Sequence, residues 1–168
     1  MMQFLTIIFS KIGSNDSTLE GSRQHVPLNE YRENLESILK YLTGWGLDKE
    51  KILLISPPKV DDNAWNDYCN KMDYEQSHFD HLATIYAKES VAFAKENSLA
   101  YLDLNSIMAD QGDSYKSLLY DGLHFSKSGS EVLFNSLKPM LEENILKDAR
   151  LQYPLFIDID AKNPVLKQ

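Results

Sequence analysis

Short apolar runs alternate along the chain with segments in which apolar residues recur at helical spacing. Residues 4–9 (FLTIIF) and 51–58 (KILLISPP) are typical of strands buried on both faces, and residues 99–104 (LAYLDL) predict a third, shorter strand. The apolar positions of residues 28–42 and 78–97 follow a helical repeat. Because strands that alternate with helices favour parallel pairing, the pattern predicts a layered α/β fold.

The rest of the chain predicts one domain followed by a tail. Residues 60–70 (VDDNAWNDYCN) are polar, irregular and preceded by two prolines, so they predict a loop. A last long helix is expected to begin near residues 126–128, because a capping-box pattern starts at Ser128. We place the domain at residues 1–149 and the tail, which contains two prolines and little periodicity, at residues 150–168.

Composition and charge limit the classes of binding partner and the cellular compartment that we expect. Hydrophobic residues make up 43% of the 168 residues, which is enough to build a core. The net charge of -8 argues against nucleic acid and anionic membrane surfaces as partners. The single cysteine, Cys69, cannot form an intramolecular disulfide, and the run at residues 4–9 lacks the flanking charge and cleavage site of a signal peptide. We therefore expect a cytoplasmic protein.

Three polar residues are expected at the carboxyl ends of the predicted strands, where sites form in parallel α/β folds. Asp121 and His124 lie three residues apart, and an aspartate beside a histidine can fix its tautomer and stabilise the imidazolium when the ring acts as a base. Asn15 follows the first strand, in a loop where Gly13 allows close backbone approach, and its amide could stabilise an oxyanion. Together they predict part of an acyl-transfer site.

Each of these signals also has a purely structural interpretation. Asp121 and His124 could be a turn aspartate and a surface histidine, and the loop of Asn15 could be an Asx-type turn. His78 and His81, with Asp80 between them, raise the alternative of a metal-dependent hydrolase. Their spacing, without a cluster of further ligands, is more typical of a solvated helix face, so we expect no metal and no other cofactor.

The residues as a set resemble the GDSL/SGNH hydrolases, and among them the isoamyl acetate-hydrolysing esterases. The resemblance rests on GSND at residues 13–16, KILLISPP at residues 51–58 and DGLHFSKSGSEVLF at residues 121–134. It implies a three-layer α/β/α fold of the flavodoxin-like type with a five-stranded parallel sheet. It also implies hydrolysis of small carboxylic esters without a metal, a role in lipid metabolism, Asn15 as an oxyanion donor, and Asp121 and His124 as acid and base.

The chain departs from this family at its beginning. The family's Gly-Asp-Ser block, which carries the nucleophilic serine, and its oxyanion glycine both precede the Gly-x-Asn-Asp block, and residues 1–12 contain neither. We therefore expect an N-terminally incomplete member with its first strands missing. Ser114, in Gly-Asp-Ser at residues 112–114, comes after the third strand, in the wrong order for the nucleophile. The chain is expected to be inactive as written.

Two functions follow from these observations. The first is a carboxylic-ester hydrolase acting on a small-molecule ester by Ser-His-Asp acyl transfer. The second is a non-catalytic binding or regulatory protein that retains the fold. An apolar edge strand at residues 4–9 would also promote self-association, because an unpaired edge can add another strand.

Overall fold

The core of the structure is a parallel sheet of three described strands. The computed structural model describes residues 8–10 and 12–144, and within them the sheet has the order β1-β2-β3. Ile8 pairs with Ile52, and Leu53 pairs with Ala100. The bounds are Ile8–Ser10 for β1, Ile52–Ile55 for β2 and Ala100–Leu102 for β3. The parallel arrangement confirms the predicted fold class, although most of the first predicted strand lies outside the described residues.

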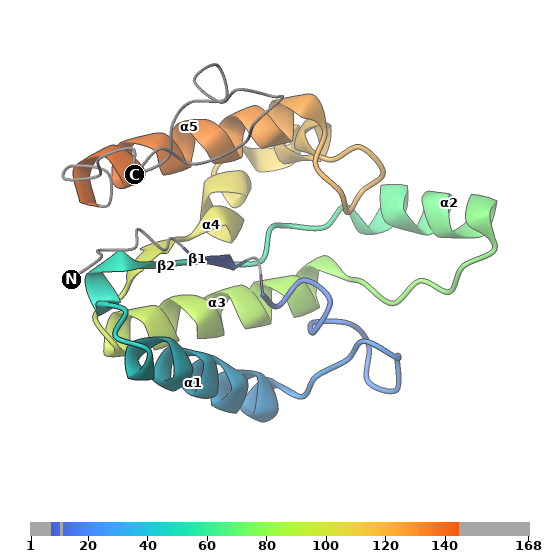
Figure 1. Cartoon of the computed structure of the whole chain (residues 1–168). Helices are drawn as coiled ribbons and strands as arrows, with labels where there is room; N and C mark the ends of the chain where they lie inside the picture. Colours follow the sequence, from blue (N-terminus) through green and yellow to red (C-terminus); the bar gives the residue numbers. More distant parts are fainter. Residues whose placement is uncertain (1–7, 11, 145–168) are drawn as a thin grey trace, which may run out of the picture.

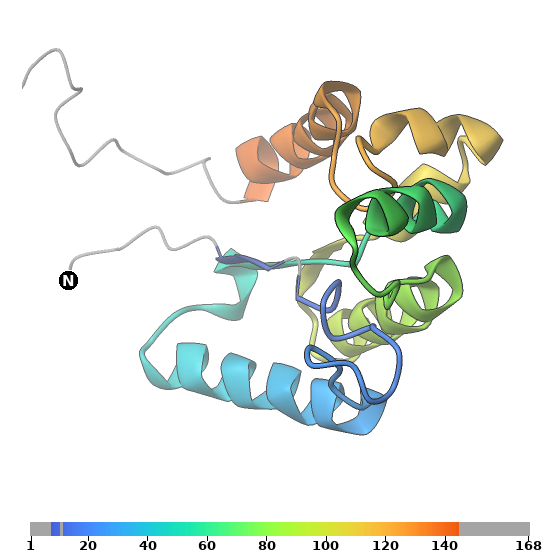
Figure 2. The same ribbon diagram turned by 90° about the vertical axis from the view of Figure 1, so that its right-hand side faces the viewer.

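Helices cover both faces of this sheet (Figures 1 and 2). One face carries the two 17-residue helices, and the opposite face carries a short and a long helix; in chain order these are α1 (Leu28–Gly44), α3 (Asp80–Glu96), α4 (Leu104–Ala109) and α5 (Lys127–Asn144). This is the predicted three-layer architecture. No helix within residues 8–10 and 12–144 has the length and apolar character that crossing a membrane requires.

The central strand β2 explains why both layers pack against the sheet. All four of its residues are buried, and successive side chains of a strand point to opposite faces. Ile52 and Leu54 join the core under α1 and α3, while Leu53 and Ile55 join the core under α4 and α5. Because both faces of β2 are buried, its sequence is a continuous apolar run rather than an alternation of apolar and polar residues.

The predicted loop at residues 60–70 is wrong, because the structure has a helix there, α2 (Asp62–Met72). Asp61 caps it, with its carboxylate accepting from the N–H groups of Asn63 and Ala64 at 3.2 and 3.3 Å. Trp65 and Cys69, one turn apart, form its buried face. Two buried residues in eleven give too short an apolar stripe for the sequence pattern to reveal.

The cap of α5 also differs from the predicted one. The hydroxyl oxygen of Ser126 accepts a hydrogen bond from the N–H of Gly129 at 3.2 Å, so Ser126 rather than Ser128 caps the helix. A Cβ on Gly129 would lie 2.1 Å from the carbonyl oxygen of Leu118. The first turn of α5 is thus packed directly on the segment before the Asp121 turn. The helix continues through Pro139, which the sequence predicts to bend it.

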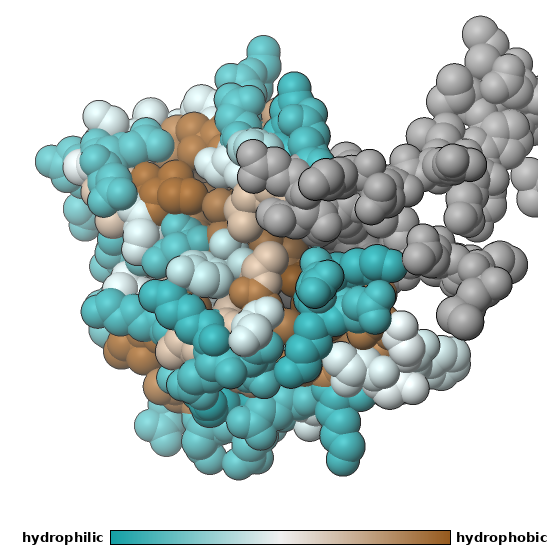
Figure 3. Space-filling model, turned by 90° about the vertical axis from the view of Figure 1, so that its left-hand side faces the viewer, coloured by the Kyte–Doolittle hydropathy of each residue, from teal (hydrophilic) through white to brown (hydrophobic). Residues whose placement is uncertain are grey.

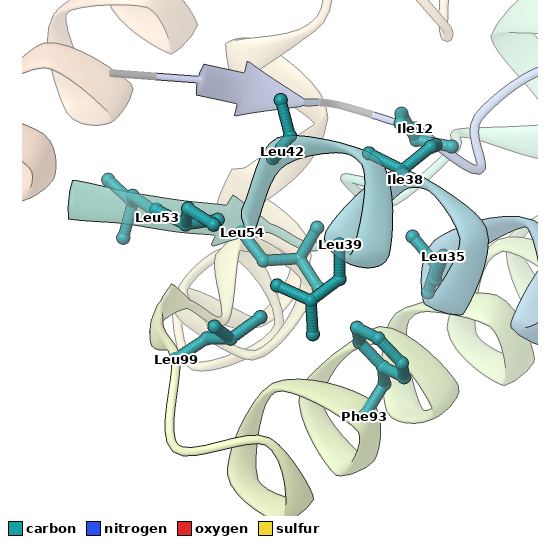
Figure 4. Close-up of a pocket in the computed structure, with 10 residues that line it drawn as sticks. Ile12, Leu35, Ile38, Leu39, Leu42, Leu53, Leu54, Phe93 and Leu99 are labelled. Carbon is teal, nitrogen blue, oxygen red and sulfur yellow. The ribbon is translucent and has the colours of Figure 1, made fainter. Parts of the chain in front are cut away.

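A small apolar cavity of ≈ 30 Å³ lies between α1 and the sheet (Figure 4). Its ten lining side chains, among them Leu39, Leu54 and Phe93, are all apolar. A water molecule there would find no side-chain hydrogen-bond partner, so we interpret the cavity as a packing gap. On the face of the molecule where the strands begin, hydrophobic side chains reach the surface between hydrophilic ones (Figure 3).

Candidate active site

Three segments meet on the side of the sheet where the strands end (Figure 1). Residues 12–27 follow β1, residues 56–61 follow β2, and the turn at residues 119–125 lies beside the start of α2. The N–H of Asp61 donates to the carbonyl oxygen of Gly122 at 2.8 Å, which ties the second segment to the third. This is the sheet edge at which the sequence predicts a site.

Asp121 and His124 form a hydrogen-bonded pair. Nδ1 of His124 lies 2.7 Å from Oδ2 of Asp121, and Oδ1 of the same carboxylate accepts from the backbone N–H groups of Leu123 and His124 at 3.0 and 2.8 Å. The Asp121 side chain is 5% exposed and that of His124 is 68% exposed. Within the described residues the ring of His124 hydrogen bonds only to Asp121, so its Nε2 is left for another partner.

The carboxylate form of Asp121 is favoured by its surroundings. Burial by itself would raise the pKa of this side chain. The hydrogen bonds from the backbone and ring of His124 and from the backbone of Leu123, together with the charge of His124, outweigh burial and lower the pKa below its usual value. An ionised, buried acceptor is the form that stabilises an imidazolium at its side.

The turn that carries this pair is fixed by backbone contacts. Leu119 and Phe125 form an antiparallel bridge, and the N–H of Tyr120 donates to the carbonyl oxygen of His124 at 2.6 Å. Gly122 has a φ of +94°, and a Cβ there would lie 2.4 Å from the backbone nitrogen of Trp65. Only glycine allows this close approach of the turn to α2.

The loop of Asn15 is anchored on the other side of the site. Gly13 has a φ of +115°, and a Cβ there would lie 2.8 Å from Cγ of Pro57 and 3.0 Å from the hydroxyl oxygen of Tyr31. The hydroxyl of Thr18 donates to the carbonyl oxygen of Asn15 at 3.0 Å. These contacts set the backbone of the loop and leave the Asn15 side chain at the surface.

Below this loop, Tyr31 makes a buried hydrogen-bonded link. Its hydroxyl donates to the carbonyl oxygen of Ile12 at 3.1 Å and lies 2.6 Å from the hydroxyl of Ser90. Burial raises the pKa of Tyr31 to about 12, so the phenol keeps the proton that it donates. Helices α1 and α3 therefore both support the junction between β1 and the loop.

Two aromatic residues that the sequence did not assign to the site lie between these segments. Trp65 packs edge-on against the rings of His78 and His124, with centroid distances of 5.6 and 5.9 Å. His78 in turn pairs with Thr18 of the Asn15 loop in an antiparallel bridge. Trp65 and Cys69, four residues apart and apolar within a polar segment, were the available signal that this stretch packs on something.

His78 therefore does not lie on a solvated helix face as expected. It precedes α3 and is 7% exposed, and its pKa is lowered by burial and by the charge of His124. His81 is exposed on the first turn of α3, against the ring of Phe79. Across the described part of the chain, no three His, Cys, Asp or Glu side chains gather in a group that could hold a metal ion.

Among the described residues, no hydrogen bond links Ser114 to Asp121 or His124. Ser114 lies exposed in the 3₁₀ helix Gly112–Leu118, where its carbonyl oxygen accepts from the hydroxyl of Ser117 at 2.8 Å. Asp61 and Asp62, which fall in the predicted loop at residues 60–70, have structural roles. Asp61 caps α2, and Oδ1 of Asp62 accepts from the N–H of Asp80 at 2.7 Å.

Solved structures share this fold. A lipase/acylhydrolase from Enterococcus faecalis superposes with a TM-score of 0.63 at 24% identity, covering 81% of this chain and 60% of that chain. A mutant of an acetyl-xylooligosaccharide esterase from Geobacillus superposes with a TM-score of 0.57 at 18% identity, covering 80% of this chain and 57% of that one. Both likenesses confirm the arrangement of helices and sheet.

Sequence relatives are closer. The isoamyl acetate-hydrolyzing esterase 1 homologs of Rattus norvegicus and Homo sapiens are 35% and 33% identical over 164 residues, which cover 96% of this chain and 64% of each relative. The chain thus spans less than two thirds of the length of these relatives. A GDSL esterase/lipase of Arabidopsis thaliana is 34% identical over 96% of this chain and 68% of its own length.

The match to a family model agrees with these relatives. The model of the GDSL-like lipase/acylhydrolases matches residues 5–137, a range that includes the Asn15 loop and the Asp121 turn. With the fold, the relatives and the family model in agreement, the chain belongs to the GDSL-like lipase/acylhydrolase family.

Proposed function

We propose that this chain supplies the acid, the base and an oxyanion donor of a carboxylic-ester hydrolase that acts on small esters of the isoamyl acetate type. The observation that carries the proposal is the 2.7 Å contact between Nδ1 of His124 and the buried carboxylate of Asp121, beside an otherwise exposed ring. The family membership supports ester hydrolysis, and the names of the animal relatives support the class of ester.

In the proposed reaction His124 acts twice. Its Nε2 takes the proton of a serine hydroxyl as the serine oxygen attacks the ester carbonyl, and it then returns that proton to the departing alcohol. Asp121 stabilises the intermediate imidazolium, and the side-chain amide of Asn15 donates to the oxyanion. Water then attacks the acyl-serine, losing its proton to His124, and the carboxylic acid leaves as the serine regains its hydrogen.

We further propose that the serine is not one of these 168 residues. Residues 1–12 contain no Gly-Asp-Ser, and no hydroxyl of the described residues hydrogen bonds to the ring of His124. Ser114 is exposed on a separate 3₁₀ helix. Without a nucleophile only binding and oxyanion stabilisation are left, which give a small fraction of the activity of a full triad.

The first test measures turnover of p-nitrophenyl acetate by the 168-residue chain. We expect the rate to match that of His124→Ala and Ser114→Ala, all three close to the buffer rate. Turnover that disappears in His124→Ala but persists in Ser114→Ala would contradict the absence of a nucleophile. Loss of turnover in both variants would instead assign the nucleophile to Ser114.

The second test reads the DNA upstream of the Met1 codon. We expect an in-frame Gly-Asp-Ser after an apolar run. In a protein extended to include it, His124→Ala should lower kcat roughly 10⁶-fold and Asn15→Ala roughly 10²-fold. Stop codons in every upstream frame would overturn the esterase proposal. They would favour the second function, a non-catalytic protein that binds a small ligand at the same site.

A further inference from the structure

Trp65 is a buried residue at the site to which the proposed reaction assigns no role. The residue is 7% exposed, and its ring contacts three other rings. Tyr68 stacks on it at a centroid distance of 5.4 Å and an interplanar angle of 14°, and His78 and His124 approach it nearly at right angles, at 86° and 73°. The indole is thus fixed by packing against its neighbours. A ring that is fixed in this way can restrict the orientation of the histidine ring that it contacts.

The ring of His124 needs such a contact. It is 68% exposed, and the one hydrogen bond that it makes within the described part of the chain, between Nδ1 and Asp121, restrains only one corner of the imidazole. In the described residues Trp65 is the aromatic ring that packs on it, with a centroid distance of 5.9 Å. The carboxylate and the indole therefore contact the imidazole at two places.

The backbone of Trp65 is also locked to the turn that carries His124. The N–H of Asp61 donates to the carbonyl oxygen of Gly122, and the backbone nitrogen of Trp65 lies 2.4 Å from the position that a Cβ of Gly122 would take. The backbone that carries the indole is therefore fixed relative to the turn that carries the imidazole. A flexible attachment would not allow one ring to orient the other.

Through His78, Trp65 is linked to the loop of Asn15. His78, which Trp65 contacts, pairs with Thr18, and the N–H of Leu19 donates to the carbonyl oxygen of Ser77 at 2.9 Å. The buried Nε1 of Trp65 and Nε2 of His78 have no hydrogen-bond partner within the described part of the chain, so the two rings interact by packing. One indole thus lies between the loop of the oxyanion donor and the ring of the base.

We propose that Trp65 is a positioning residue that holds the His124 ring in one orientation relative to the loop of Asn15. The catalytic meaning of this role rests on the proposed function, but the orientation can be measured without turnover. Trp65 does not touch the reacting atoms in this proposal and acts only through His124.

The test uses NMR on the isotopically labelled 168-residue chain. In the native protein we expect nuclear Overhauser effects between the ring protons of Trp65 and His124, and three-bond couplings of His124 that correspond to a single χ1 rotamer. A native spectrum with rotamer-averaged couplings, or without ring-to-ring effects, would overturn the proposal and needs no variant to do so.

Variants separate positioning from stability. Trp65→Ala should average the His124 couplings, while Trp65→Phe, which keeps a ring, should restore the single rotamer. Cys69→Ala is the matched control, because Cys69 is 1% exposed in the same helix and the same cluster and makes no ring contact with His124. Native couplings in a folded Trp65→Ala variant, or averaged couplings in Cys69→Ala, would contradict the role of Trp65.

Discussion

Among the individual residues, His78 has the clearest effect on how stability depends on pH. The pKa of His78 is lowered from 6.5 by burial and by the charge of His124. Between the lowered value and pH 6.5, His78 is therefore protonated in the unfolded chain and neutral in the folded chain. The stabilisation that comes from a neutral His78 is therefore complete above pH 6.5 and is lost as the pH falls towards the lowered value.

We expect the free energy of unfolding of the native chain to fall more between pH 7.5 and pH 5.5 than that of His78→Leu. Urea titrations at the two pH values measure the difference. His81→Gln is the control, since His81 is exposed three residues further along, and it should keep the native pH dependence. Equal pH dependence in the native chain and in His78→Leu would show that His78 is not the group responsible.

The residue scale also shows what sequence could and could not predict of the site. Asp121 and His124 lie in one turn, so their spacing along the chain was enough to predict the pair, and the structure puts them 2.7 Å apart. Trp65 and His78 reach the same place from segments about 50 residues away in the chain. No local pattern encodes such a contact, because it depends on how α2 and the start of α3 pack after the chain has folded.

At the scale of single elements, the contact of α2 with the Asp121 turn depends on Gly122. An alanine there would place its Cβ 2.4 Å from a backbone nitrogen and 2.7 Å from a backbone oxygen, and neither atom can move without moving the helix. We expect Gly122→Ala to lower the free energy of unfolding by about 3 kcal/mol or more.

Gly21→Ala is the control that distinguishes the backbone strain of a positive φ from the steric clash of an added Cβ. Gly21 also has a positive φ, +88°, but a Cβ there would meet nothing within 4 Å. Its substitution should cost only about 1 to 2 kcal/mol. Denaturant titrations of both variants provide the measurement, and equal losses would mean that the packing of Gly122 against α2 contributes nothing beyond backbone strain.

Helix α1 supports the Asn15 loop through one phenol. Tyr31→Phe removes the hydrogen bond to the carbonyl oxygen of Ile12 and the contact with Ser90, and we expect it to destabilise the fold by about 1 to 3 kcal/mol. Tyr41→Phe is the matched control, because Tyr41 lies on the same helix at 63% exposure, and it should change stability by less than about 0.5 kcal/mol. Thermal unfolding of both variants compares the two, and similar losses would argue against the buried link.

The elements themselves were predicted to different degrees, for physical reasons. Helices α1 and α3 have several buried residues each at helical spacing, so their periodicity was visible. Helix α2 buries only Trp65 and Cys69, and its polar remainder resembles a loop. A helix that is stabilised mainly by its cap and two contacts carries too little pattern to be recognised from sequence alone.

At the scale of the whole molecule, the described sheet leaves one side of β1 unpaired. Within residues 8–10 and 12–144, β1 pairs with β2 and with no other strand, and an edge of this kind can add a strand from another chain. Ile38 and Tyr41 are exposed on helix α1, and Trp45 is exposed directly after its end. The net charge of -8 opposes association, but charge repulsion is screened at physiological salt.

We therefore expect the chain to self-associate with increasing concentration. Light scattering during size-exclusion chromatography measures the mass, and hydrogen exchange at residues 8–10 should slow as oligomers form, because pairing protects backbone amides. If oligomers form without such slowing, and a Tyr41→Ala/Trp45→Ala variant stays monomeric, the helix surface rather than the strand edge is the interface. A monomer at every concentration would refute self-association.

The layered architecture was the part of the whole molecule that the sequence predicted best. Its cause is the central strand β2, whose four consecutive apolar residues need a helix layer on each side to be buried. The layers can be predicted without knowledge of individual contacts. The wrong predictions at α2 and at the cap of α5 therefore do not affect the predicted architecture.

The unequal surroundings of the two tryptophans give the protein an intrinsic optical probe of its site. Trp45 is 79% exposed and Trp65 is 7% exposed, and the chain has no other tryptophan. A water-soluble quencher such as iodide should therefore extinguish the emission of Trp45 first and leave the shorter-wavelength emission of Trp65. The residual fluorescence would report from beside His124, so that a small molecule binding there could be followed by light in the unmodified chain, whether or not it is turned over.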